Sequence, residues 1–451
     1  MPADLLRSAA SPACTPLGIL AGSGVLPLEV AAAAQAAGRP VHIIAIEGFA
    51  ADAVADYPHT WANIGQVGRM IRGFRQAHCD EIIIVGGMRR PNLWKVKIDS
   101  GFFRSIGTVL KMTRGGDDSI LRRIVTFFEL QGFKVCGVHD VAPHLLARIG
   151  VLGAVQPTEA HRTAIARGVR LIGALGTFDV GQGAVVTEKE VLAIEGARGT
   201  DAMLSEVREQ ARRCTGGRER AGVLVKLPKP GQELRIDLPV IGLETIERAV
   251  EAGLGGVAVR GGQSLVIGSE AMLRRADANG IFVVGLDGSE PEGRPARNAE
   301  AAVDAAPLEI LGRHAPTPAD RRDIALGRRL MPVLEAHDAG DAAVIAGEHV
   351  LAINAGMPAS AMLVGGTGSG SHWGRRAFRK RHGVLVVRSP QVILGDAQGD
   401  DEEAIRFGWM AEAGLAGIVC VSGAFPADLE RPAIEQANEA GLFLMAAARA
   451  A

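Results

Sequence analysis

Short apolar runs alternate with longer amphipathic stretches along the first third of the chain. Each run has the length of a buried strand and ends at a glycine or a polar residue, and a helical pattern fills the intervals. The runs are Leu17–Ala21, Val41–Ile46, Glu81–Val85 and Lys134–Val138. Strand and helix alternation of this kind predicts βαβ units around a parallel sheet. We therefore predict a Rossmann-like α/β domain over residues 1–151.

A second alternating pattern covers residues 156–288. Two helices are predicted, over Arg162–Leu175 and from Thr200 to about Arg213. We expect Thr200 to cap the second helix and Asp201 to favour its N-terminus. The predicted strands are Ala184–Thr187 and Val191–Ile194, which form a hairpin, followed by Val223–Leu227, Gly256–Val259 and Ile281–Val284. This pattern predicts a second α/β domain.

The second domain occurs twice in the sequence. Eight of its residues stand 159 positions before identical residues, and four more stand 161 positions before theirs. The first set is Pro157, Thr158, Gly168, Asp179, Gly181, Leu192, Ile194 and Met203, and the second set is Gly222, Ala252, Gly253 and Gly280. A spacing that persists over so long a stretch indicates duplication. We predict a linker over residues 289–315, rich in Pro and Ala up to Ala306, and a degenerate copy over residues 316–451.

The two copies differ in their polar residues. The retained positions are mostly apolar residues, Gly and Pro, which set packing and turns. Five polar residues of the first copy, Glu195, Thr200, Asp201, Lys226 and Asp237, are replaced by Asn354, Ala359, Ser360, Val387 and Gln398. Free drift of a surface residue explains any single loss equally well. Asp237 is the strongest functional candidate, because it follows a Lys-Pro-Gly-Gln segment of the kind in which loops bind ligands.

Composition excludes several classes of protein. The chain has 451 residues, so two or three domains are expected. A net charge of −1 and only 4% aromatic residues argue against a nucleic-acid partner. The five cysteines show no C-x-x-C spacing, so they predict reduced thiols rather than a zinc site or disulfides. No signal peptide and no long apolar run is apparent, and we expect a cytoplasmic protein.

A glycine loop follows the first predicted strand. Gly22-Ser23-Gly24 lets backbone N–H groups approach an anion at a helix N-terminus, and Pro27 suits the first helical turn. The loop is similar to a dinucleotide fingerprint without its third glycine, with Glu47 in the place of the ribose-binding acid. A plain tight turn explains it equally well.

Three further segments at predicted strand ends or helix starts carry polar groups. Gly86-Gly87-Met88 and the arginines after it follow the third strand, where open parallel sheets bind ligands. Asp117 and Asp118 open a helix, where they can cap it or bind a hard cation. His139 directly follows the fourth predicted strand, and we expect it to make either a ligand contact or a structural hydrogen bond.

These motifs together resemble a known enzyme family. The segments are Leu17-Gly-Ile-Leu-Ala-Gly-Ser-Gly-Val-Leu-Pro27, Gly115-Gly-Asp-Asp118, Asp179-Val-Gly-Gln-Gly-Ala-Val-Val186, Gly199-Thr-Asp-Ala-Met-Leu204 and Lys226-Leu-Pro-Lys-Pro-Gly-Gln-Glu-Leu-Arg-Ile-Asp-Leu-Pro239. In this order they are similar to the two-domain UDP-2,3-diacylglucosamine pyrophosphatases of lipid A synthesis, which are unrelated to calcineurin-like phosphoesterases. The resemblance runs from about Leu17 to Leu286. Ser23 departs from it, because a third consecutive glycine is common there, and so does everything after about Ser289.

The resemblance implies a reaction and a set of residues. The family cleaves UDP-2,3-diacylglucosamine to UMP and 2,3-diacylglucosamine 1-phosphate with a divalent cation, Mg²⁺ or Mn²⁺. The aspartate of its Arg-x-Asp-x-Pro motif is catalytic, which implies that role for Asp237. The implied substrate-binding residues are Gly22, Ser23, Gly24, Gly86, Gly87, Met88, Asp117, His139, Gln182, Gly199, Thr200, Asp201, Ala202 and Lys226. The metal ligands stay open among Asp117, Asp118 and Asp237.

Partners follow from the same resemblance. The acylated substrate implies peripheral contact with the inner membrane, and the sequence leaves a homo-oligomer open. Two other functions compete with hydrolysis: a nicotinamide-dependent oxidoreductase that uses the first glycine loop with Glu47, and a nucleotide-sugar-binding regulator without turnover. The oxidoreductase does not explain the selective loss of Asp201 and Asp237 from the second copy.

Overall fold

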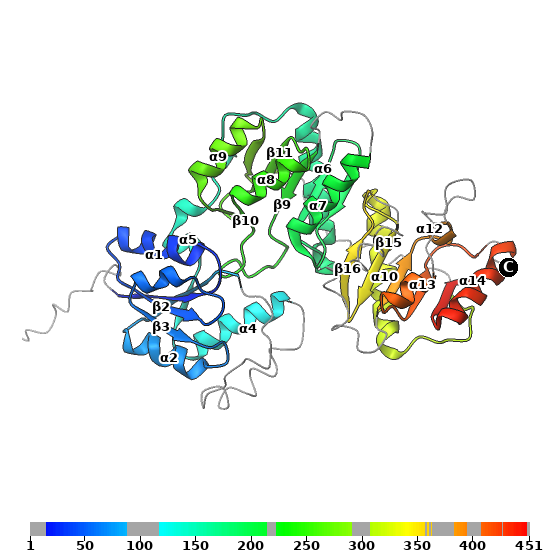
Figure 1. The fold of residues 1–451 in the computed structure, drawn as a ribbon, viewed down its shortest axis with the longest axis horizontal. Coiled ribbons are helices and arrows are strands. Elements are labelled where there is room, and N and C mark those ends of the chain that lie inside the picture. The colour runs from blue at the N-terminus through cyan, green and yellow to red at the C-terminus, as the bar shows by residue number, and fades with distance from the viewer. Residues whose placement is uncertain are drawn as a thin grey trace, which may run out of the picture. The chain divides into compact units, whose positions relative to one another are not determined.

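The structure is a computed structural model in which two compact units are described. The described residues are 15–87, 117–213, 222–290, 307–356, 359, 362, 383–394, 407–425 and 427–448. Unit 1 comprises residues 1–148, 231–242 and 262–269, and unit 2 comprises residues 149–230, 243–261 and 270–451. Both units alternate strands with helices, as predicted (Figure 1).

Unit 1 is built on a five-stranded parallel sheet in the order β3-β2-β1-β4-β5. Its strands are β1 (Leu17–Ala21), β2 (Val41–Ile46), β3 (His59–Ala62), β4 (Glu81–Val85) and β5 (Lys134–Cys136). Its helices are α1 (Leu26–Ala36), α2 (Val67–Gln76), α4 (Asp117–Leu130) and the short α5 (Val138–Val141), and short 3₁₀ turns lie at Asp52–Asp56 and Pro143–Leu145.

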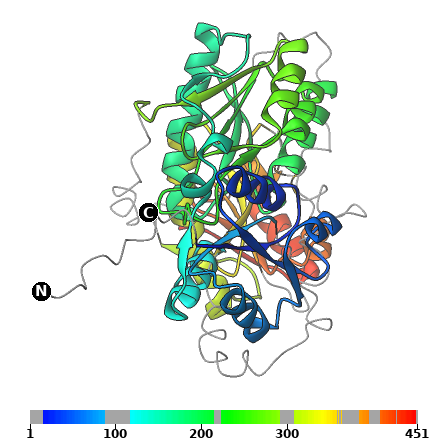
Figure 2. The same cartoon turned by 90° about the vertical axis from the view of Figure 1, so that its left-hand side faces the viewer.

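Helices cover both faces of this sheet. Successive strand residues point to opposite faces, and each face has its own apolar core. Ile43 packs in the cluster that contains Val30 and Ala34 of α1, whereas the adjacent Ile44 packs in the cluster that contains Phe74 of α2. Figures 1 and 2 show α1 on one face and α2 on the other. Strands buried on both faces explain the continuous apolar runs in the sequence.

Two segments from the middle of the chain complete unit 1. Residues 231–242 and 262–269 carry β10 (Val240–Ile241) and β12 (Leu265–Val266), which pair in parallel as a two-stranded sheet. Leu238 and Leu265 belong to the same apolar cluster as Ala21 and Val85, the last residues of β1 and β4. By sequence Asp237 lies inside the second domain, but its segment packs with the first.

Unit 2 contains two six-stranded sheets. The first has the order β6-β13-β11-β9-β7-β8. Its strands are β6 (Gly150–Val151), β7 (Gly183–Val186), β8 (Val191–Ile194), β9 (Val223–Lys226), β11 (Gly256–Arg260) and β13 (Phe282–Leu286). Its helices are α6 (Glu159–Leu175), α7 (Gly199–Arg213), α8 (Leu243–Glu251) and α9 (Ser269–Ala278), and a 3₁₀ turn at Gly176–Phe178 follows α6. The hairpin and the central parallel strands agree with the predicted elements.

The second sheet has the same plan, in the order β14-β19-β18-β17-β15-β16. Its strands are β14 (Leu308–Ile310), β15 (Ala342–Ala346), β16 (His349–Ile353), β17 (Val384–Val387), β18 (Gly417–Cys420) and β19 (Phe443–Ala447). Its helices are α10 (Pro318–Ala336), α12 (Gln391–Leu394), α13 (Phe407–Glu412) and α14 (Ala427–Ala440). The hairpin bulge lies between Val185 and Val186 in the first sheet and between Val344 and Ile345 in the second.

Packing explains why certain glycines occur in both copies. A Cβ on Gly168 would lie 2.6 Å from a methyl group of Val225, and a Cβ on Gly327 would lie 2.5 Å from Val386. Each glycine is where a long helix, α6 or α10, crosses its sheet. Any larger side chain would force the helix away from the strands.

Several predicted boundaries need correction. The fourth strand ends at Cys136, because Val138 already begins α5. Strand β3 was not predicted, because it begins with His59 and Thr60 at the edge of the sheet and is only partly buried. The three cysteines within the described ranges, Cys79, Cys136 and Cys420, are buried and free.

Candidate functional site

The two glycine loops of unit 1 form one hydrogen-bonded structure. The Ser23 amide donates to the Gly87 carbonyl at 2.8 Å, and the Gly87 amide donates to the Ser23 carbonyl at 3.0 Å. The Ser23 hydroxyl donates to the same Gly87 carbonyl at 2.8 Å. A Cβ on Gly22 would lie 2.7 Å from the Gly87 carbonyl oxygen, and one on Gly86 would lie 2.8 Å from Ser23. The contact between the loops therefore accounts for Gly22 and Gly86.

Gly24 has a different role in the first loop. Its φ is +93°, and a Cβ there would meet nothing within 4 Å. It stands two residues before α1, whose first turn contains Pro27 as predicted. Gly24 thus leaves open space beside a helix N-terminus, which is where an anionic group can approach backbone N–H groups.

Three predicted site residues cannot be placed fully. Met88 lies outside the described residues. Asp117 and Asp118 form the first turn of α4, and their side chains lie outside the described part of the structure. Among the described residues, no group of three His, Cys, Asp or Glu side chains gathers as a metal site.

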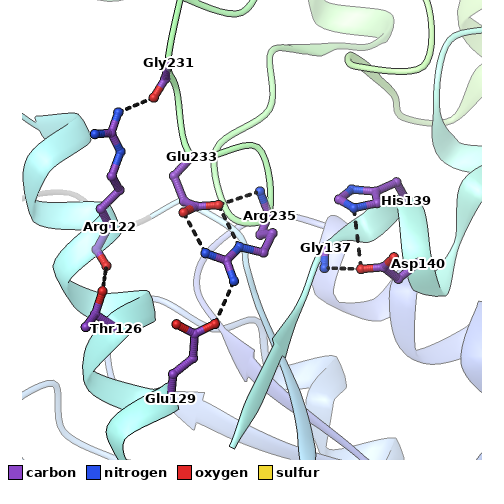
Figure 3. A network of polar contacts seen from close by, with 9 residues as sticks. All are labelled: Arg122, Thr126, Glu129, Gly137, His139, Asp140, Gly231, Glu233 and Arg235. Atoms are coloured by element: carbon purple, nitrogen blue, oxygen red, sulfur yellow. Dashed lines mark hydrogen bonds and ion pairs between the residues drawn. The ribbon is translucent and has the colours of Figure 1, made fainter.

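His139 takes part in a local structure at the start of α5. Its ring Nε2 lies 3.5 Å from a carboxylate oxygen of Asp140, and both side chains are exposed. The same Asp140 oxygen accepts from the Gly137 amide at 2.9 Å, which closes the N-terminal turn of α5 (Figure 3). The His139 ring thus lies near the Asp140 carboxylate, and its role stays a prediction.

Asp237 lies on a loop anchored by its neighbours. Ile236 packs against the apolar cluster on one face of the unit 1 sheet, and Leu238 packs into the cluster on the other. The Asp237 amide donates to the Glu233 carbonyl at 3.0 Å, so the backbone forms a turn just before it. Gln232 donates from Nε2 to the Asp237 carboxylate at 2.6 Å. Packing of the partly buried Ile236 and the buried Leu238 fixes the position of the partly exposed carboxylate between them.

Arg235 fastens this loop to α4. Its guanidinium donates to both Glu233 carboxylate oxygens at 2.8 Å and to Glu129 of α4 at 2.7 Å (Figure 3). These hydrogen bonds lower the pKa of Glu233, despite partial burial, and raise that of Arg235. Arg122 of α4 donates to the Gly231 carbonyl at the start of the loop. The arginine of the Arg-x-Asp motif thus positions the loop.

In unit 2, a buried acid lies at the end of β8. Glu195 is 7% exposed, and its Oε1 accepts from the Thr200 hydroxyl at 2.8 Å. Its Oε2 has no hydrogen-bond partner among the described residues. Helix α7 begins at Gly199, so Thr200 lies inside it and donates to Glu195. The prediction that Thr200 caps the helix is therefore wrong.

Glu195 and the buried Lys226 lie on the same face of the sheet. A Cβ on Gly183 would be 3.0 Å from Glu195 Oε2, and Gly183 pairs directly with Lys226 on the adjacent strand. Directly paired residues of antiparallel strands point to the same face. Gln182 precedes Gly183, and its carbonyl accepts from the Leu227 amide at 2.8 Å. This face of the sheet therefore carries one buried carboxyl and one buried amino side chain.

The other predicted residues at the start of α7 are Gly199, Asp201 and Ala202. Asp201 is exposed in the first turn, as predicted, and forms an ion pair with Arg248 of α8 at 3.1 Å. Gly199 has a φ of +80° with open space beyond it, and Ala202 is half-buried. Unit 2 therefore joins Thr200 to Glu195 by a hydrogen bond, while the adjacent Asp201 pairs with Arg248.

The second copy has lost this arrangement as a set. Asn354 takes the place of Glu195, and its side-chain oxygen accepts from the Asp341 and Ala342 amides at 2.9 and 2.8 Å. Its Nδ2 donates to the Asp341 carboxylate at 2.7 Å. Ala359 and Val387 replace the hydroxyl and the ammonium group. The Asn354 amide is thus hydrogen-bonded to its own loop through both its oxygen and its nitrogen. Glu195 has an oxygen without a hydrogen-bond partner in the part of the chain that the structure describes.

Sequence reasoning missed two features of the site. The bonds from Arg235 to Glu233 and Glu129 join residues far apart in sequence, and no local pattern predicts them. The pairing of Glu195 with Thr200 had a signal, because both residues are lost together from the second copy. No helix in the described part of the chain is long and apolar enough to cross a membrane.

Glycine loops at the carboxyl ends of parallel strands, followed by a helix N-terminus, are typical of α/β proteins that bind phosphate groups. Comparison with known proteins agrees. Residues 16–145 match the family model of the LpxI N-terminal domain, and residues 148–284 match that of the LpxI C-terminal domain. The chain is 39% identical over 280 residues to the UDP-2,3-diacylglucosamine pyrophosphatase LpxI of Caulobacter vibrioides, covering 62% of this chain and 99% of that protein. The chain therefore belongs to the LpxI family.

Proposed function

We propose that this protein hydrolyses the pyrophosphate bond of UDP-2,3-diacylglucosamine, giving UMP and 2,3-diacylglucosamine 1-phosphate in lipid A biosynthesis. The observation that carries the proposal is the match to both LpxI domains, together with 39% identity over nearly the full length of a relative with this name. In this reaction the oxygen of a water molecule bonds to one phosphorus, and the bridging oxygen leaves with the other.

In this proposal Asp237 is the catalytic residue. Its carboxylate is held by Gln232 and by the turn from Glu233, so it is oriented before substrate binds. A fixed carboxylate can accept a proton from the attacking water, or it can ligate the cation. Either role is worth more in the transition state than in the ground state, because charge develops on the attacking and leaving oxygens.

The loops of unit 1 are proposed to bind the nucleotide and its phosphates. Gly24 gives open approach at the N-terminus of α1, and the Ser23–Gly87 bonds keep the two loops together. Gly22 and Gly86 support this arrangement by allowing the loops to touch, and Met88, Asp117 and His139 are proposed contacts beside them.

A divalent cation, Mg²⁺ or Mn²⁺, is proposed as the cofactor. Mg²⁺ is commonly bound by one or two carboxylates together with substrate phosphates, rather than by a cage of protein ligands. The described residues fit this arrangement, because they offer the Asp237 carboxylate on a fixed loop. Asp117 and Asp118 remain the other candidates. When bound, the cation would neutralise charge on the diphosphate.

Unit 2 is proposed to supply the remaining substrate contacts. Thr200, Asp201 and Lys226 are the candidates, with Gln182, Gly199 and Ala202 beside them. Glu195 is added as a positioning residue, because it accepts the Thr200 hydrogen bond while buried. The two acyl chains of the substrate favour work at a membrane surface, and we propose that the protein contacts the inner membrane peripherally from the cytoplasm.

The test is turnover of the proposed substrate. Purified protein is incubated with UDP-2,3-diacylglucosamine and Mg²⁺ or Mn²⁺, and UMP is measured, with UDP-N-acetylglucosamine as a matched substrate without the acyl chains. We expect UMP from the acylated substrate and much less from the control. Tight binding without UMP release, under conditions where the protein is folded, would refute the proposal.

A further inference from the structure

The two copies in unit 2 share one hydrophobic core. Helices α6 and α10 occupy equivalent positions in the two copies and contact each other. Leu171 and Leu175 of α6 belong to the same buried cluster as Leu330 and Leu334 of α10. Leu330 stands 159 positions after Leu171, and Leu334 stands 159 positions after Leu175. The two helices therefore use equivalent sides to form the shared core.

The aromatic and basic residues beyond these helices are also reciprocal. Arg329 of the second copy lies over the Phe178 ring of the first, 5.7 Å from its centroid, a cation–π distance. The residue equivalent to Arg329 is Arg170, and the residue equivalent to Phe178 is His337. Burial, and then the positive charges of Arg170 and Arg167, lower the pKa of His337. The first copy therefore places positive charge near the position equivalent to Phe178.

The edge strands repeat this reciprocity. The Ala197 amide, just after β8, donates to the Leu351 carbonyl of β16 at 3.2 Å. In the other direction, Gly356, just after β16, approaches the Leu192 carbonyl of β8 so closely that a Cβ would lie 2.4 Å from it. Leu192 is equivalent to Leu351, and Ala197 is equivalent to Gly356. Both strands are the last in their sheets, and each contact covers an exposed edge.

Contacts in which position i meets position j, and j meets i, define an isologous two-fold interface between subunits. We propose that the second copy occupies, within a single chain, the place of a second subunit, and that this face of the first copy is self-complementary. In a pair of first copies, Arg170 would stand where Arg329 stands and Leu192 where Leu351 stands. The cation–π contact and the edge-strand contact would then form from both sides.

This interface also supports the turn that precedes α7. Ala197 lies between Glu195 and Gly199, and its hydrogen bond to Leu351 fixes the backbone between the buried acid and the Thr200–Asp201 turn. The second copy lacks equivalents of Glu195, Asp201 and Asp237. Through this hydrogen bond it still helps to fix the backbone of the first copy. The proposal concerns association and does not depend on the reaction that the first copy catalyses.

The test separates the two halves of the full chain without removing either. A protease site is placed within residues 291–306, the purified chain is cleaved there, and the mass of the eluting species is measured by light scattering. We expect both halves to elute together with the mass of the intact chain. Separation of the unmodified halves at micromolar concentration would overturn the proposal.

A matched pair of variants then locates the interface. Gly356→Val places a side chain against the Leu192 carbonyl and should weaken association of the halves by roughly tenfold or more. Gly347→Val is the control, because its φ of +60° is close to the +66° of Gly356 while a Cβ there meets nothing within 4 Å. Equal effects of the two variants would contradict the proposed contact.

The same experiment tests self-complementarity. Gly356→Val lies in the second half, so the first half released from it keeps its natural surface. We expect this released half to pair with itself and to elute with twice its own mass. A released first half that stays monomeric up to the concentration at which the unmodified halves associate would show that the face is not self-complementary, and the proposal would fall.

Discussion

Removal of the Arg235 side chain tests whether loop position limits activity. Arg235→Ala deletes a two-pronged hydrogen bond to Glu233 and a single one to Glu129. Charged hydrogen bonds contribute about 1.5–3 kcal/mol when buried, but exposed ion pairs contribute about 0.2–1 kcal/mol. The Arg235 side chain is 35% exposed and that of Glu129 is 42% exposed, so the energies of exposed ion pairs apply. The Glu233 side chain is only 14% exposed, so its bonds to Arg235 contribute slightly more.

The sum is about 1.5 kcal/mol for holding the loop on α4, which is about tenfold in the ratio of docked to undocked loop. We expect kcat/KM for UMP release to fall by up to about that factor in Arg235→Ala, with partial recovery in Arg235→Lys. The control is Arg39→Ala, which removes a 2.7 Å ion pair to Glu81 at the amino end of β4 in the same sheet. Arg39→Ala should lower stability and leave kcat/KM unchanged.

A pH series adds a second readout to the Arg235 experiment. The Arg235 hydrogen bonds lower the pKa of Glu233 in the folded protein below 4.5. Their stabilising contribution is therefore complete above pH 4.5 and is lost as the pH falls through the lowered pKa. The stability difference between the natural protein and Arg235→Ala should shrink over that range. Unchanged kcat/KM in Arg235→Ala, in a variant that has lost stability as expected, would refute the reasoning.

Three further predictions concern other parts of the molecule. Gly24→Ala should raise KM, whereas Gly132→Ala, with a φ of +92° and equally open space, should cost similar stability and leave KM unchanged; equal KM values would make the first loop a simple turn. Glu195→Gln should lower kcat/KM while Asn354→Asp does not, and full activity of Glu195→Gln would remove Glu195 from the site. Burial and the charge of Arg170 lower the pKa of His337 below 6.5. The contribution of neutral His337 to stability is therefore complete above pH 6.5 and is lost as the pH falls through the lowered pKa. His337→Gln should abolish this loss of stability, as measured by denaturant unfolding at each pH.

Much of the fold could be predicted because local pattern determines it. The strands of unit 1 are buried on both faces, so each is a continuous apolar run such as Val41–Ile46 that can be recognised in the sequence. The duplication could be recognised because both copies need a glycine where the long helix packs on the sheet, as at Gly168 and Gly327. The partly polar edge strand β3 was missed, since it lacks that burial.

The candidate site was predictable in its motifs but not in its packing. The segment with Asp237 follows β9 in sequence, yet it packs with the first unit through Ile236 and Leu238. Only tertiary contacts decide this, because two apolar side chains fit either core equally well by composition. The hydrogen bonds from Arg235 to Glu233 and Glu129 also depend on tertiary contacts, so the sequence alone could not predict them. The reciprocal contacts between the two copies likewise require both sheets to be in place.

The central claim is that Asp237 is the catalytic carboxylate, and one pair of variants tests it most directly. Asp237→Ala and Gln398→Ala are compared for single-turnover UMP release from UDP-2,3-diacylglucosamine and for substrate binding. Loss of a group used mainly in the transition state commonly costs about a hundredfold or more, roughly 3 kcal/mol. We predict that Asp237→Ala folds, binds substrate and releases UMP at least about a hundredfold more slowly, while Gln398→Ala behaves like the natural protein. Near-normal turnover in Asp237→Ala, or equal damage in Gln398→Ala, would contradict the account.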